Sequence, residues 1–87
     1  MNLHTLRRHV DRLDGQLVRL LNRRTKLALE IGRIKQVQKR PVYDAQREVL
    51  VLRHITQANR GPLSAGAVRR VFQVVLRECR RRERAHT

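Results

Sequence analysis

The first 38 residues carry an unbroken heptad pattern. Ten positions alternate at steps of three and four, and nine of them are apolar. The members of this heptad seam are Leu3, Leu6, Val10, Leu13, Leu17, Leu20, Arg24, Leu27, Ile31 and Ile34. Such spacing predicts one long helix, over residues 2–38, that packs along a partner helix. At 1.5 Å per residue the helix would be about 55 Å long.

Two breaks divide the rest of the chain. Pro41 disfavours helical backbone at the residue before it, and segment 59–64 is rich in turn-forming residues. The sequence therefore predicts two further helices, over residues 44–58 and 64–84. Because no strand-type alternation is visible, the expected fold class is all-α, with one long and two shorter helices per chain.

Each short helix has a suitable N-cap residue and one apolar face. Asp44 and Ser64 are of the type that caps a first turn. The apolar faces comprise Val49, Leu52 and Ile55 in the first helix, and Val68, Val71, Phe72, Val75, Leu76 and Cys79 in the second, followed in line by Glu83. Neither helix is long enough to cover the heptad seam. A second copy of the long helix would cover it, so we expect a homodimer.

Length and cysteine content narrow the class of protein. The 87 residues suffice for one domain, 1–87, which would be only marginally stable as a monomer. Cys79 is the one cysteine, so an intrachain disulfide is impossible and a cytoplasmic location is expected. No apolar run approaches the roughly 20 residues that cross a bilayer, and the N-terminus lacks a secretory apolar core. We therefore expect no membrane association.

The net charge of +14, with 21 Lys and Arg residues, raises the possibility of nucleic-acid binding. The basic residues are spread along the whole chain, and only Tyr43 and Phe72 could stack on bases. Zinc-finger spacing is absent. The C-terminal RRRERAHT is the most nucleic-acid-like stretch, and a solvated helix end explains it equally simply. Specific nucleic-acid binding is thus the alternative from another functional class.

Arg24 interrupts the heptad seam with a charge. A buried arginine is costly unless an anion meets it, so Arg24 either reaches out to solvent or faces a cavity that holds an anion. Lys35 lies 11 residues later, on the same side and about 16 Å along the axis. A small anion could contact both. Arg7 lies 17 residues before Arg24 and could join them only from the other chain of an antiparallel dimer.

Three polar residues open the second helix, and one ends the third. Asp44, Arg47 and Glu48 could simply cap the helix and pair along it. Glu83 could be a solvated member of an Arg-rich helix end. Its alignment with Cys79 on the apolar face argues mildly against that interpretation.

Taken in order, these residues resemble the all-helical chorismate mutases. The shared motifs are Leu6-Arg7, Asp14-x-x-Leu17-Val18-x-Leu20-Leu21-x-x-Arg24, Ile31-Gly32-x-x-Lys35, Arg40-Pro41-Val42-Tyr43-Asp44-x-x-Arg47-Glu48 and Val71-Phe72-Gln73-x-Val75-Leu76. Each motif alone is weak, and the ordered set is specific. The likeness covers nearly the whole chain, so we expect a free-standing domain without a fused enzyme.

The resemblance implies an intertwined antiparallel homodimer that converts chorismate to prephenate, an isomerase step towards phenylalanine and tyrosine. It implies that Arg7 of the partner subunit and Arg24 bind the substrate carboxylates, and that Lys35 reaches a carboxylate and the ether oxygen. It also implies that Arg47 orders the site. The ring hydroxyl would be bound by the backbone of Asp44 and would donate to Glu48. Such a pericyclic rearrangement needs no nucleophile, metal or cofactor; it needs cations that hold a reactive conformer.

Two positions depart from the best-known bacterial pattern. Cys79 stands where a serine usually helps to bind a carboxylate, and Glu83 stands where a glutamine usually donates to the ether oxygen. Glutamate occurs there in fungal members. Because an ionised carboxylate cannot donate, Glu83 must be protonated to serve this role. The nearest rival is isochorismate pyruvate lyase, which shares the fold; the Asp44-x-x-Arg47-Glu48 motif resembles the mutases instead. A regulatory protein on the same scaffold is a third possibility.

Overall fold

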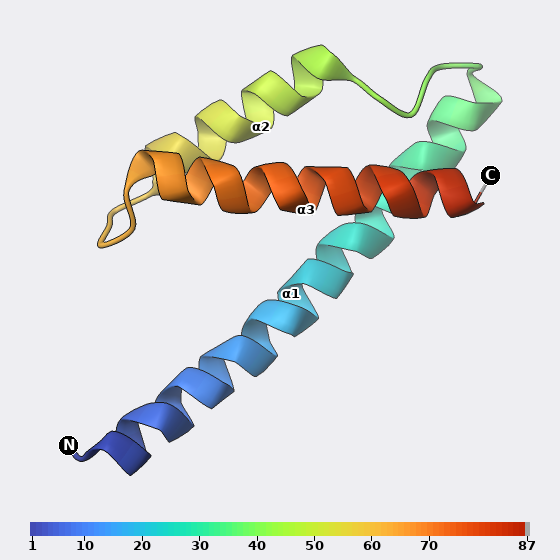
Figure 1. Ribbon diagram of the computed structural model, residues 1–87. Coiled ribbons are helices and arrows are strands. Elements are labelled where there is room, and N and C mark those ends of the chain that lie inside the picture. The colour runs from blue at the N-terminus through green and yellow to red at the C-terminus, as the bar shows by residue number, and fades with distance from the viewer. Residues whose placement is uncertain (87) are drawn as a thin grey trace.

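The computed structural model describes residues 1–86 and consists of three helices joined by short connections (Figure 1). They are α1 (Leu3–Val37), α2 (Ala45–Ala58) and α3 (Ala65–His86). Strands are absent from these residues, so the predicted all-α class is confirmed. Each helix begins one residue later than predicted, and α3 continues to His86 rather than ending at residue 84. None of the three combines the length and apolar character needed to cross a bilayer.

Capping side chains and a local motif define the ends of α1. The side chain of Asn2 accepts a hydrogen bond from the first turn. At the other end Lys39 adopts a left-handed conformation, with φ of 58°. Its N–H donates to Gln36 O at 3.1 Å, and the N–H of Arg40 donates to Lys35 O at 2.8 Å. This is the Schellman arrangement, and it ends α1 shortly after Lys35.

The predicted caps of the two shorter helices are confirmed. The Asp44 carboxylate accepts from the backbone N–H of Arg47 at 3.0 Å, and the Ser64 hydroxyl accepts from the N–H of Ala67 at 3.1 Å. Of the two local interactions considered for Asp44, the structure therefore has the backbone cap. No side-chain ion pair joins Asp44 to Arg47 among the described residues.

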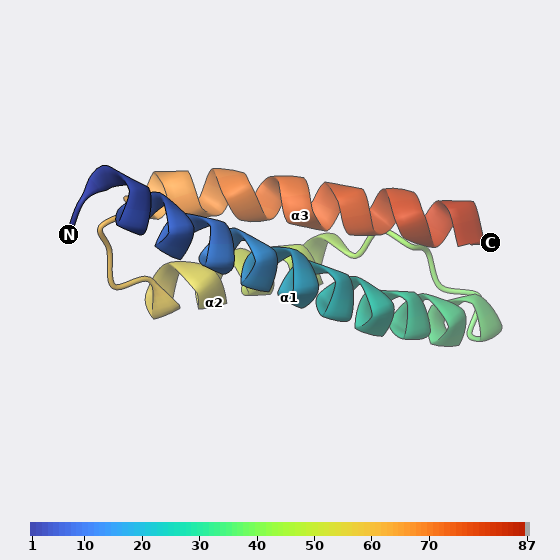
Figure 2. The same ribbon diagram turned by 90° about the horizontal axis from the view of Figure 1, so that it is seen from below.

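Helix α3 packs against both other helices, whereas α1 and α2 make no helix–helix contact with each other within residues 1–86. It crosses the C-terminal half of α1, and the N-terminal half of α1 extends away from the other helices (Figure 1). The resulting molecule is long and thin, with extents of 54 × 24 × 15 Å (Figure 2). One protomer therefore leaves much of α1 without a neighbour.

The core of the protomer is small and contains a charged residue. Val51, Leu76 and Cys79 are buried, together with Glu83. Val71, on the apolar face predicted for the third helix, is 55% exposed, and so is Val49 on the apolar face predicted for the second. Val51, which belongs to neither predicted face, is buried. At about 100° per residue, Val49 points away from the inward face that Val51 occupies. The steps of three to Leu52 and Ile55 turn back towards that face, and these two residues are half-buried.

The heptad seam lies on the surface of the single chain. All nine of its apolar members are 46–61% exposed, and α1 has no buried residue. The accessible surface of the chain is 7350 Å², whereas a compact monomer of this mass would expose about 5,400 Å². An excess of roughly 2,000 Å² is what a large interface buries. The short helices therefore do not cover the seam, as expected.

Candidate active site

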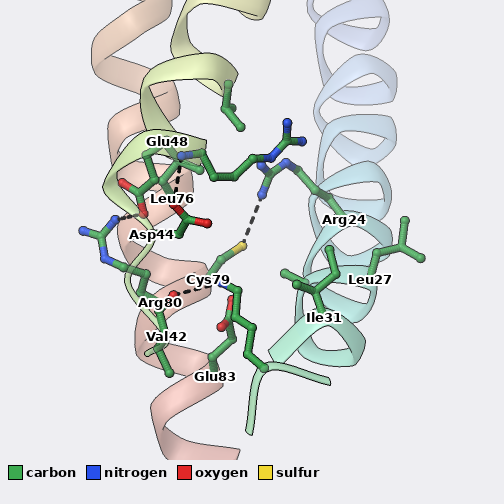
Figure 3. A pocket seen from close by; sticks show the side chains of 14 residues that line it. Arg24, Leu27, Ile31, Val42, Asp44, Glu48, Leu76, Cys79, Arg80 and Glu83 are labelled. Atoms are coloured by element: carbon green, nitrogen blue, oxygen red, sulfur yellow. Dashed lines mark hydrogen bonds and ion pairs between the residues drawn. The ribbon is translucent and has the colours of Figure 1, made fainter. Parts of the chain in front are cut away.

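A cavity of about 230 Å³ lies between the C-terminal half of α1, the start of α2 and the C-terminal half of α3 (Figure 3). Its charged lining residues are Arg24, Lys35, Asp44, Arg47, Glu48, Arg80 and Glu83. Its other lining residues are Leu27, Ala28, Ile31, Val42, Val51, Leu76 and Cys79. The cavity thus gathers three arginines, one lysine and three carboxyl groups on an apolar floor.

The two cations that the heptad pattern singled out both line this cavity. Arg24 is half-buried, and its Nη1 lies 3.6 Å from the sulfur of Cys79, to which it donates (Figure 3). Lys35 donates from Nζ to the carbonyl oxygen of Val42 at 3.0 Å. Of the two alternatives for Arg24, the structure thus has the one in which it faces a cavity. A sulfur atom is a weak acceptor, so Arg24 keeps strong donors for an anion.

Cys79 is buried on α3 and contacts α1 through two side chains. Besides Arg24, its sulfur lies 3.6 Å from the hydroxyl of Thr25, and either atom could donate. Thr25 was not among the predicted site residues. Nothing in its spacing separates it from other polar residues of α1, and only the crossing of α3 brings it to Cys79.

Glu83 is buried against α1, with 8% of its surface exposed, and its Oε2 has no hydrogen-bond partner among the described residues. Burial raises the pKa of this carboxyl above the ordinary value; Lys35 opposes the shift and Glu48 adds to it. Gly32 makes room for the side chain, because a Cβ at that position would lie 3.2 Å from Oε2. The solvated alternative for Glu83 is therefore wrong, and burial makes this carboxyl easier to protonate than an exposed glutamate.

Glu48, at the start of α2, is paired with a residue of α3. Arg80 of α3 forms an ion pair with its carboxylate (Figure 3). The guanidinium of Arg80 also lies over the ring of Tyr43, 5.1 Å from the centroid. Arg80 was not among the predicted site residues, because the Arg-rich end of the chain has the pattern of a solvated helix end. A possible signal was its place beside Cys79 and three residues before Glu83.

The remaining predicted site residues are more exposed. Asp44 is half-buried and lines the cavity while capping α2. Arg47 is exposed at the cavity rim. Arg7 is exposed on the N-terminal half of α1 and does not line the cavity of its own chain. The structure of one chain therefore brings together every predicted site residue except Arg7.

Comparison with known proteins gives consistent matches. The family model for chorismate mutase type II matches residues 6–84. The bifunctional chorismate mutase/prephenate dehydratases of Neisseria gonorrhoeae and Pseudomonas aeruginosa are 42% and 37% identical, over 93% and 88% of this chain. The chain spans 22% of the length of each. A chorismate mutase structure from Thermus thermophilus superposes with a TM-score of 0.86 at 34% identity, covering 88% of both chains.

Proposed function

The chain belongs to the chorismate mutase type II family, and on that premise we propose that it catalyses the Claisen rearrangement of chorismate to prephenate. The observation that carries the proposal is one cavity lined by Arg24, Lys35 and a buried Glu83. Cations spaced along α1 suit a substrate with two carboxylates, and the buried acid suits the oxygen between them. We propose a single mutase domain over residues 1–87, in the cytoplasm.

Binding and orientation are the first part of the mechanism. The reaction breaks the ether C–O bond while a C–C bond forms between the side chain and the ring, so both ends must be folded together. Arg24 would hold one carboxylate, and Lys35 would hold the other from the opposite end of the cavity. Freezing that compact conformer removes much of the entropic barrier. The Lys35 ammonium has three N–H donors, so it can keep its hydrogen bond to Val42 while it donates to the substrate.

Stabilisation of the ether oxygen is the second part. Negative charge builds up on this oxygen as the C–O bond lengthens, and a donor that faces it lowers the barrier. Lys35 and the neutral form of Glu83 would supply two donors. Glu48 would accept from the ring hydroxyl, beside the backbone of Asp44. Arg47 would order the open side of the cavity.

An intertwined antiparallel homodimer would complete the site. The exposed heptad seam and the excess surface of one chain support dimerisation, and the position of Arg7 supports sharing. With a two-fold axis near residues 17–18, Arg7 of the partner subunit would reach the open side of the cavity near Arg24. It would bind the carboxylate that one chain alone leaves half-enclosed.

The direct test is an assay of the purified protein with chorismate, following its loss and the formation of prephenate. Parallel reactions with isochorismate, followed by pyruvate release, test the lyase alternative. Binding of labelled duplex DNA across a salt series tests the nucleic-acid alternative. Absence of turnover with chorismate by folded protein would refute the proposed function. Pyruvate release, or tight sequence-selective DNA binding at physiological salt, would replace it with the corresponding alternative.

A further inference from the structure

Arg80 joins three segments of the chain at one wall of the cavity. It projects from α3, pairs with the Glu48 carboxylate of α2 and lies over the Tyr43 ring of the connection before α2. The side chains of Arg80 and Glu48 are 22% and 21% exposed, so their ion pair is mostly shielded from solvent. The aromatic ring further restricts the guanidinium, since cations favour the face of a π-system.

The negative charge of the cavity's carboxylates would oppose an anionic substrate, and Arg80 offsets part of that charge. Three carboxyl groups line a space that would have to accept a dianion, and like charges oppose such binding. Asp44 is engaged with the N-terminus of α2. Glu83 is buried, and its Oε2 has no hydrogen-bond partner among the described residues, so its ionised form is costly. Glu48 has Arg80 as its ion-pair partner.

Resting on the proposed function, we propose that Arg80 is a positioning residue that fixes the Glu48 carboxylate as the acceptor for a ring hydroxyl and compensates its charge beside a bound dianion. A paired carboxylate has a defined orientation and keeps free lone pairs for a further donor. The pair Arg80–Glu48 would thereby select ring dicarboxylates that carry a hydroxyl group. Without Arg80, Glu48 would be both mobile and repulsive.

A double-mutant cycle separates this role from a structural one. In the wild-type background, Arg80→Met should lower kcat/KM for chorismate about tenfold or more, mainly through KM, because an uncompensated carboxylate repels the substrate. In the Glu48→Gln background the same change should cost less than about twofold, since no charge remains to compensate. Arg80→Lys should recover part of the loss, because lysine keeps the charge but lacks the planar fork.

Two matched variants control the comparison. Arg70→Met removes the same charge from an exposed position on the same helix, outside the lining of this cavity, and it should leave kcat/KM within about twofold. Tyr43→Phe keeps the ring and should match the wild type, whereas Tyr43→Leu should lose part of what Arg80→Met loses. Equal losses from Arg80→Met with and without Glu48 would overturn the proposal. If Arg80→Met does not fold, Arg80→Lys and Tyr43→Leu replace it in the cycle, with the same criterion.

Equilibrium binding provides a readout that needs no turnover. In calorimetric titrations the wild type should prefer prephenate over a dicarboxylate of the same skeleton without the ring hydroxyl, and Arg80→Met should lose most of that preference. If Arg80 had a purely structural role, Arg80→Met would weaken the binding of both ligands equally. That result would refute the positioning role of Arg80 and leave the proposed function intact. If the wild-type protein prefers prephenate in this way but does not convert chorismate, only the proposed function is refuted. No binding of either ligand would refute both.

Discussion

Two features of its surroundings shift the pKa of Glu83 in opposite directions. Burial raises its pKa, and the nearby Lys35 cation lowers it without cancelling the rise. If the neutral acid is the donor, kcat should rise as pH falls through the folded pKa of Glu83. Glu83→Gln supplies a permanent N–H donor of the same shape, so its kcat should stay level between about pH 5 and 8. Near the upper end it should equal or exceed the wild type.

A pair of pH–rate profiles measures this difference. The comparison is internal, because both proteins share every other titrating group. Two flat profiles, or a Glu83→Gln variant inactive at every pH, would show that Glu83 does not donate to the ether oxygen. The same sign applies to stability: a raised pKa means that wild-type stability falls as pH rises between the unfolded and folded pKa values of Glu83.

Gly32 and Gly15 form a matched pair on α1. An added Cβ would crowd Glu83 at Gly32, at 3.2 Å from Oε2, but at Gly15 it would meet only a flexible Arg19 side chain at 3.6 Å. Gly32→Ala should therefore lower kcat about tenfold or more by displacing Glu83. Gly15→Ala should keep kcat and add about 1 kcal/mol of stability, because alanine favours helix. Wild-type kinetics in Gly32→Ala would contradict the seating of Glu83 described above.

Sequence periodicity predicted some site residues and could not predict others. Arg24 stands out because it breaks an apolar pattern, and Lys35 follows it at a helical spacing. Arg80 does not stand out among the arginines around it, and its partners Glu48 and Tyr43 lie more than 30 positions earlier in the chain. Its role depends on where α3 crosses the start of α2, which no local pattern encodes.

Among the elements, the end of α1 offers a test of local strain. Lys39 occupies the left-handed position of the Schellman motif, with φ of 58°, where a Cβ is unfavourable and glycine is usual. Lys39→Gly should raise the free energy of unfolding by about 1 kcal/mol. Lys39→Ala removes the same side chain but keeps the Cβ, so it should change stability by less than about 0.5 kcal/mol. Chemical denaturation at fixed protein concentration would show the difference; equal effects of both variants would contradict it.

Element boundaries followed from local chemistry, and element packing did not. Asp44 and Ser64 cap as predicted because an N-cap satisfies backbone donors within its own turn. Pro41 and the turn-forming residues 59–64 also separate the helices through local backbone preferences. The direction in which α3 crosses α1 depends on contacts between distant segments. The faces of α2 and α3 were therefore predicted only in part, as Val49, Val51 and Val71 show.

At the scale of the whole molecule, the most informative feature is how elongated and exposed a single chain is. The radius of gyration is 15.8 Å, whereas a compact domain of this length would have about 12 Å. A long amphipathic helix with its apolar seam in water is unfavourable, and this supports the proposed association through α1. The sequence predicted this shape well, because the heptad pattern fixes the helix and its length exceeds what two short helices can cover.

The proposed sharing of the site through Arg7 can be tested only on the dimer. Arg7→Ala and Arg24→Ala should each lower turnover about a thousandfold while leaving folded dimers, since each removes a cation that holds a carboxylate. In a heterodimer of the two variants, one site would combine the intact Arg24 of one chain with the intact Arg7 of the other. After complete subunit exchange in an equal mixture, about a quarter of all sites should be intact. Activity should recover to about that fraction of the wild type.

The matched control is exchange between the wild type and a chain that carries both substitutions. If Arg7 acts across the interface, each heterodimer has two sites with one arginine missing, so exchange should halve the activity of the mixture. If both arginines of a site come from one chain, that exchange would leave activity unchanged and the complementary mixture would stay inactive. Because exchange itself can be verified by mass spectrometry of tagged chains, a lack of recovery after verified exchange would rule out a site shared through Arg7.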